Sequence, residues 1–119
     1  MVGPDMGENM TEEETKEEIL YRAVPLGDVE KVTTMIEAGA DVNYRSSDGR
    51  DGETPLWVAS KQNNSEIVQI LLANNADVNK IGKDGQTPIN IASENGHSKI
   101  VQLLLANNAD VNKEDKYGK

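Results

Sequence analysis

The sequence predicts an all-α fold, a solenoid of about three stacked helix–turn–helix units with projecting hairpin-like loops. The main observation is an internal repeat, because residues 51–83 and 84–116 are identical at 21 of 33 aligned positions. A more diverged copy lies upstream at an offset of 36 residues, where residues 39–43 match the later copies. Hydrophobic residues make up 36% of the chain and aromatic residues 3%, which is little for one globular core but suits thin stacked layers.

The first helix of each unit is expected to start at a capping pair. Thr-Pro pairs at residues 54–55 and 87–88 place a capping hydroxyl before a proline whose missing N–H costs nothing in the first helical turn. We expect helices of about two turns to follow, over residues 56–62 and 89–95. The three extra residues of the first offset fall within residues 45–50, so the connecting loop is expected to be longer there.

The second helix of each unit is predicted from an apolar stripe. Its positions follow the spacing i, i+1, i+4, i+5 and comprise Ile67, Val68, Leu71 and Leu72 in one copy and Ile100, Val101, Leu104 and Leu105 in the next. The predicted helix ends share one property, the tolerance of glycine and asparagine for a left-handed C-cap, and are Gly27, Asn63, Gly96, Gly39, Asn75 and Asn108.

The first copy departs from this pattern at both ends of its first helix. It lacks a Thr-Pro start, and Thr11 with Glu14 offers a capping box instead, which predicts a longer and more polar first helix. Pro25 disfavours helical backbone at Val24, so we expect that helix to end early.

These patterns carry a family resemblance that recurs in register. In the third copy it consists of Asp84-Gly85-Gln86-Thr87-Pro88-Ile89, Ala92, Gly96-His97, Ile100-Val101, Leu104-Leu105 and Ala109-Asp110-Val111-Asn112. The pattern resembles the ankyrin repeat and covers roughly residues 17–119. The resemblance implies helix pairs stacked into a curved ankyrin-repeat solenoid that is stabilised by contacts between neighbouring repeats.

The expected organisation follows from the positions of the copies. We expect an acidic, flexible tail over residues 1–10 and an ankyrin-repeat domain over residues 11–119, with repeats at roughly 17–50, 51–83 and 84–116. After residue 116 the sequence continues as the loop of a next, truncated repeat, which predicts a piece of a longer protein or a neighbour covering that face. Self-association through the uncovered C-terminal repeat face is therefore expected.

Composition and charge restrict the partners. Nine of the 21 acidic residues but two of the 12 basic residues lie within residues 1–30, and no basic face is visible for nucleic acid. The chain has no cysteine, no apolar run of the roughly 20 residues that span a bilayer and no secretory signal at its start. We expect an intracellular, cytoplasmic protein with no membrane and no nucleic-acid partner.

Catalytic and metal motifs are weak. His97 is the single histidine, so a catalytic triad or a histidine-rich metal site has too few residues, and a structural role at the start of a helix is preferred. The loop opening Asp77-x-Asn79 resembles a calcium loop, but Ile81 and Pro88 stand where oxygen ligands are required. We expect no enzyme activity, no metal and no cofactor.

The resemblance implies that another protein binds at the loop tips and the concave face of the inner helices. Carried over position by position, this candidate surface comprises Tyr44, Arg45, Arg50, Asp51, Glu53, Trp57, Lys61, Gln62, Ile81, Lys83, Asp84, Gln86, Asn90, Glu94 and Asn95. The last two copies differ most at these positions, which is expected of a binding site on a shared scaffold and also of drift at an unconstrained surface.

Trp57 has two interpretations. Tryptophan is enriched at interface hot spots, where its truncation can cost ~2 kcal/mol or more. Alternatively it packs between repeats, at a position where the family usually has histidine, and enlarges a core poor in aromatic residues. The sequence favours packing slightly.

Two alternative functions remain. Ankyrin repeats resemble targets of an asparagine hydroxylase that favours a leucine eight residues and an aspartate two residues before the asparagine. Asn79 and Asn112 fit this spacing, although both also suit a structural role as braces of the hairpin turns. The other alternative is a docking segment of a longer enzyme or regulator.

Overall fold

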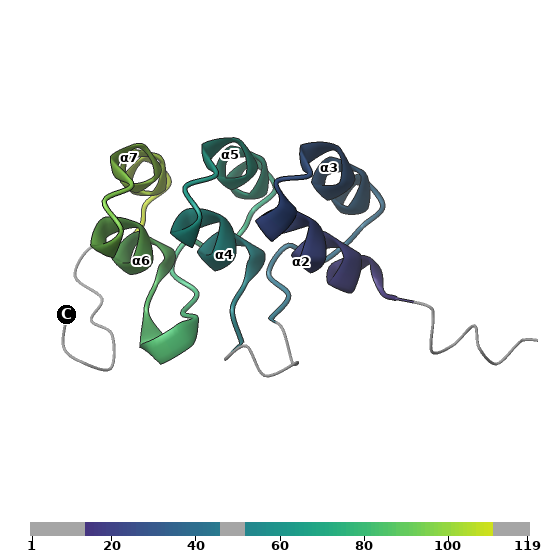
Figure 1. Cartoon of the computed structure of the whole chain (residues 1–119), viewed down its shortest axis with the longest axis horizontal. Helices are drawn as coiled ribbons and strands as arrows, with labels where there is room; N and C mark the ends of the chain where they lie inside the picture. The colour runs from purple at the N-terminus through teal and green to yellow at the C-terminus, as the bar shows by residue number, and fades with distance from the viewer. Residues whose placement is uncertain (1–13, 46–51, 111–119) are drawn as a thin grey trace, which may run out of the picture.

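The computed structural model describes residues 14–45 and 52–110. Within them the chain forms six α-helices in two layers (Figure 1). The inner layer contains α2 (Lys16–Leu26), α4 (Pro55–Lys61) and α6 (Pro88–Glu94), and the outer layer contains α3 (Val29–Glu37), α5 (Ser65–Ala73) and α7 (Ser98–Ala106). A short 3-10 turn, η2 (Lys83–Gly85), lies in the loop before α6. The predicted all-α solenoid of helix pairs is confirmed.

The two threonine caps form as predicted. The hydroxyl of Thr54 accepts a hydrogen bond of 3.1 Å from the backbone N–H of Trp57, and that of Thr87 accepts one of 3.2 Å from Asn90 N–H. Each helix begins at the following proline and ends one residue before the expected end. The Thr-Pro pair therefore sets where each inner helix starts.

All six predicted helix ends adopt the left-handed conformation. Their φ angles run from +60° at Asn63 to +97° at Gly39. Asparagine and glycine tolerate this conformation better than other residues, so the chain can reverse direction sharply after each helix. This confirms the prediction that fixed the helix ends in every copy.

The start of α2 corrects one prediction. The capping box is formed by Thr15 and Glu18, whose side chains each accept from the other's backbone N–H at 3.1 Å, and α2 begins at Lys16. Thr11 lies outside the described residues, and Glu14 pairs with the guanidinium of Arg22 instead. Thr15 succeeds because its box lies next to the first buried residues of the helix.

The predicted early end of α2 is wrong, because the helix continues through Pro25 to Leu26. A proline costs most inside a helix, where its ring removes a hydrogen bond and crowds the preceding turn. Here only one helical residue follows it. Gly27 N–H then bonds to Val24 O at 3.0 Å, and Asp28 N–H to Ala23 O at 3.1 Å, which completes the last turn.

The core lies between the layers and between neighbouring repeats. The middle pair, α4 and α5, contacts helices on both sides and buries Leu56, Ile67, Val68 and Leu71 to 1% exposure or less. Full burial of one such side chain contributes roughly 1.5–3 kcal/mol. The stability of each unit thus depends on its neighbours.

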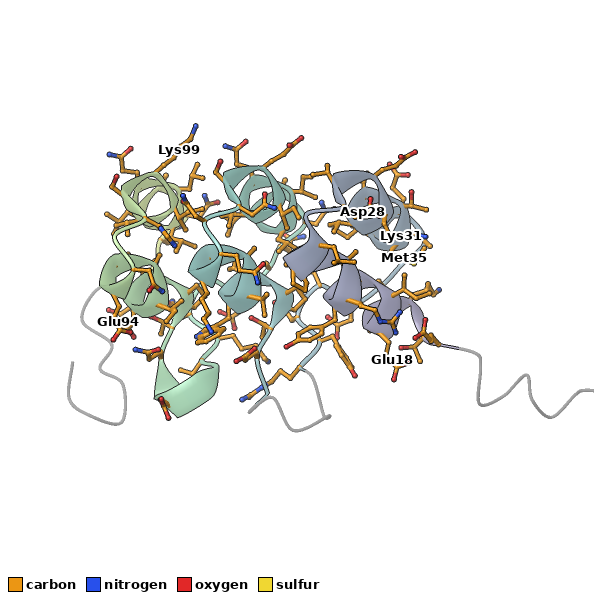
Figure 2. The ribbon with its side chains drawn as sticks, in the orientation of Figure 1. Glu18, Asp28, Lys31, Met35, Glu94 and Lys99 are labelled. Carbon is orange, nitrogen blue, oxygen red and sulfur yellow. The ribbon has the colours of Figure 1, made fainter. Side chains whose placement is uncertain are left out.

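The two ends of the stack differ in chemistry. At the first end, Arg22 and Lys31 are exposed where the middle repeat has the buried residues Val58 and Ile67. Figure 2 shows Lys31 on the outer side of α3. Charged side chains at these positions give this end a polar surface that water can cover.

Among the described residues, no helix combines the length and apolar character needed to cross a membrane.

Candidate functional site

The exposed C-terminal ends of the inner helices form a row across the stack. Because α2, α4 and α6 lie side by side in the inner layer, equivalent positions on them are neighbours (Figure 1). We call this the inner-helix row, and its exposed members are Pro25, Leu26, Lys61, Gln62, Glu94 and Asn95. Leu26 is 76% exposed, the most exposed large hydrophobic side chain of the described residues.

Leu26 was missed in the sequence analysis, although a signal for it exists. Candidate positions were carried over in the second and third copies, and the first copy was left out at this point. Gly27 aligns with Asn63 and Gly96, so Leu26 occupies the position of Gln62 and Asn95. Its place on the exposed row follows from that alignment.

Trp57 lies in the core and not on the surface. Its side chain is 1% exposed, and its Nε1 donates a hydrogen bond of 3.0 Å to the backbone O of Gln86 in the following loop. The same carbonyl accepts from Gly82 N–H at 2.8 Å, so the indole supports the loop that this bond closes. The packing interpretation is therefore the one that the burial supports.

Lys61 and Glu94 carry opposite charges at equivalent positions of the row. The Nζ of Lys61 lies 5.7 Å from the centroid of the Trp57 ring, which places the cation at the edge of the buried indole. The carboxylate of Glu94 accepts from the side-chain amide of Gln86 at 2.9 Å. Both side chains remain exposed and are oriented by these neighbours.

Asn90 is held by the backbone and only half-exposed. Its Oδ1 accepts from Thr87 N–H at 3.0 Å, which completes a capping box at the start of α6. This bond takes the place of the histidine pattern that is usual in the family. Asn90 is thus part of the local fold, and its contribution to a surface is limited.

The first connecting loop joins the first two repeats through polar and aromatic contacts. Tyr44 packs edge-on against Tyr21, with ring centroids 6.3 Å apart, and Tyr21 Oη donates to Glu53 Oε1 at 3.3 Å. Arg45 is exposed and donates from Nε to Gly52 O at 3.0 Å. Of the loop candidates, Arg50 and Asp51 lie outside the described residues.

The second connecting loop presents a smaller surface. Ile81 is half-buried, Lys83 begins η2, and Asp84 adopts a left-handed φ of +59°. Together with Gln86 these residues form the tip between the second and third repeats. The structure therefore brings the described loop candidates together in two tips below the inner helices.

A ladder of side-chain carbonyls joins successive turns. Asn43 Oδ1 accepts from Asp77 N–H at 2.7 Å, and Asn79 Oδ1 accepts from Asp110 N–H at 2.8 Å. This confirms the structural role of Asn79 as a brace. Its hydroxylation stays a prediction, and Asn112 lies outside the described residues.

Glu17 takes the place of the asparagine at the first step of this ladder. Its Oε2 accepts from Asp41 N–H at 2.8 Å. That backbone hydrogen bond is the main cause that lowers the pKa of Glu17 below its ordinary value, because it stabilises the charged form. The ladder thus begins with a carboxylate and continues with amides.

His97 has the structural role that was expected of it. It occupies the N-cap position of α7, and its Nε2 lies 2.9 Å from the backbone O of Lys61. The contact ties the third repeat to the end of α4. This carbonyl is one of the four that the end of a helix leaves without a helical partner.

Comparison with known proteins agrees with the fold. A family model of three ankyrin repeats matches residues 9–115. Among relatives, "Ankyrin repeat domain-containing protein 40" of Mus musculus is 37% identical over 68 residues, which are 57% of this chain and 18% of the relative. The mitochondrial disaggregase of Bos taurus is 40% identical over 65 residues, 55% of this chain and 9% of that protein. The chain spans less than a fifth of the length of these relatives, and by the match over nearly all of its residues it belongs to the ankyrin-repeat family.

Proposed function

We propose that this chain is a non-catalytic module that binds another protein through the inner-helix row and the two loop tips. Ankyrin repeats are generally protein–protein interaction modules. The outer helices and the apolar stripes are occupied by stacking, so the row and the tips are the part of the inner layer left for a partner. A partner seated there would touch three repeats at once.

One observation carries this proposal. The second and third copies keep the same buried framework, including Ala59 and Ala92 at 0% exposure, but reverse the charge between Lys61 and Glu94. Stacking does not require this change, because both side chains are exposed. Variation in chemical type on a constant scaffold is what a site for one particular surface requires.

The experiment is a pull-down with a charge-exchanged variant. The double variant Lys61→Glu, Glu94→Lys keeps the net charge and exchanges the two charges of the row. The matched control, Glu66→Lys, Lys99→Glu, makes the same exchange at equivalent exposed positions of the outer helices α5 and α7. We expect the first variant to lose partners that the parent chain and the control capture from lysate of the native source, as identified by mass spectrometry.

The comparison is meaningful only if both variants fold. Surface substitutions usually change the free energy of unfolding by less than ~0.5 kcal/mol, so both are expected to melt within a few degrees of the parent chain. Capture of the same proteins by all three chains would show that the row is not the binding surface.

We also propose self-association through the last repeat. Ser93 and Val101 are exposed and half-buried, whereas their equivalents Ser60 and Val68 are fully covered by the third repeat. A second copy can cover the same face, and the polar first end of the stack, with Lys31, favours contact between two last repeats over head-to-tail stacking. Sedimentation velocity should show a dimer that Val101→Glu abolishes, and a monomer at all concentrations would contradict this proposal.

A docking role within a longer protein is the remaining candidate. Two relatives are named as enzymes, the disaggregase and the 2-5A-dependent ribonuclease of Homo sapiens, and the matched segment is 9% and 8% of their length. The repeats of this chain would then place a catalytic domain next to the bound protein. In that case the chain still acts by binding.

A further inference from the structure

The inner-helix row has an ordered chemical sequence across the three repeats. Leu26 offers an exposed apolar side chain on α2, Lys61 a cation on α4 and Glu94 an anion on α6. In Figure 2 Glu94 projects at the end of the stack opposite to Glu18 and Lys31. The row thus runs from apolar to positive to negative, and each type occurs once.

We infer that the partner contributes an extended segment with an apolar residue, an acidic residue and a basic residue in this order, lying against Leu26, Lys61 and Glu94 respectively. The inference rests on the proposed function and names the chemistry of the partner. Opposite charges attract across such an interface, and like charges in the same places suppress wrong partners. The apolar residue covers the leucine, which is otherwise left in water.

The spacing of the partner residues follows from the spacing of the helices. Neighbouring packed helices lie about 8–10 Å apart. An extended chain advances about 3.3 Å per residue, so about three residues bridge neighbouring repeats. The expected motif is therefore apolar-x-x-acidic-x-x-basic, in either chain direction. A helical segment advances only ~1.5 Å per residue and would need a longer spacing.

Two further contacts support a rigid recognition surface. Lys61 lies over the edge of the buried Trp57 ring, and Glu94 is hydrogen-bonded to Gln86. These neighbours restrict where the two charges can lie. Side chains that are already oriented lose less conformational entropy when a partner binds.

The test uses synthetic peptides and fluorescence anisotropy. The first probe is a fluorescein-labelled peptide with the core Leu-Gly-Ser-Glu-Gly-Ser-Arg, and the second has the same core in reverse order. A third and a fourth carry Glu and Arg exchanged. We expect one of the first two probes to bind the parent chain about tenfold more tightly than its charge-exchanged counterpart, because two attractive pairs become repulsive.

The charge-exchanged protein provides the decisive comparison. Lys61→Glu, Glu94→Lys should invert the preference and bind the exchanged peptide about tenfold more tightly, whereas Glu66→Lys, Lys99→Glu should behave as the parent chain. Leu26→Ser should weaken binding of the preferred peptide several-fold in both charge backgrounds. Inversion by the row variant with no change in the outer-helix control would establish the pairing.

The outcomes separate this inference from the proposed function. If neither peptide direction binds, or if the preference does not invert, the extended segment with this charge order is wrong. A natural partner that is still lost from the pull-down with Lys61→Glu, Glu94→Lys would then leave the proposed function standing. Failure of both experiments would remove the inner-helix row as a binding surface.

Discussion

Replacing Trp57 with alanine is expected to lower the free energy of unfolding by ~3–5 kcal/mol, the usual range for tryptophan-to-alanine changes in a core. The indole is 1% exposed and belongs to the core cluster that joins the second repeat to the third. Its removal leaves a cavity and also frees the carbonyl of Gln86 from one of its two donors. In a short stack this loss is a large share of the total stability.

The measurement is urea unfolding followed by far-ultraviolet circular dichroism. Leu26→Ala is the control, because Leu26 is 76% exposed and its truncation should change the free energy of unfolding by less than ~0.5 kcal/mol. The alternative outcome is just as informative. A Trp57→Ala variant that unfolds within ~1 kcal/mol of the parent chain but no longer captures the partner would make Trp57 a contact residue, against its burial here.

The helix positions could be predicted from the sequence because their signals are local. A capping threonine, a proline in the first turn and a glycine or asparagine at the end each act within a few residues. Thr54, Thr87 and the left-handed residue Asn63 all have the predicted roles. The error at Pro25 has the same origin, since a local rule for helix interiors was applied to a residue in the last turn.

The candidate site could be predicted only in part because exposure depends on neighbouring repeats. Lys61 and Glu94 were placed on the surface from their position in the repeat, and the structure exposes both. Trp57 occupies the same surface in the repeat pattern, yet its environment is set by Gly82 and Gln86 in the following loop. Contacts at that distance in the chain leave no periodic signal, so its two interpretations stayed open until the loop was placed.

Replacing Gly82 with alanine is the second large effect that we expect. A Cβ at this position would lie 2.8 Å from Cγ and Cδ1 of Trp57, which is closer than packed carbon atoms approach each other. The ring cannot move away freely, because it is buried and its Nε1 is bonded to Gln86 O. Overpacking of this kind costs ~1–3 kcal/mol, and we expect Gly82→Ala to destabilise the chain by that amount.

A double-mutant cycle separates this steric cause from the backbone cost that any glycine can carry. Gly96→Ala is the matched control, because Gly96 has a left-handed φ of +72° but nothing within 4 Å of an added Cβ. In a Trp57→Leu background the smaller side chain leaves room for the added methyl group, so the cost of Gly82→Ala should fall by ~1 kcal/mol or more, while the cost of Gly96→Ala should not change. Urea unfolding of the single and double variants measures both couplings. Equal costs of Gly82→Ala in the two backgrounds would show that the tryptophan ring does not require a glycine at this position, and that the close contact between the loop and the second repeat is not what holds Trp57 in the core.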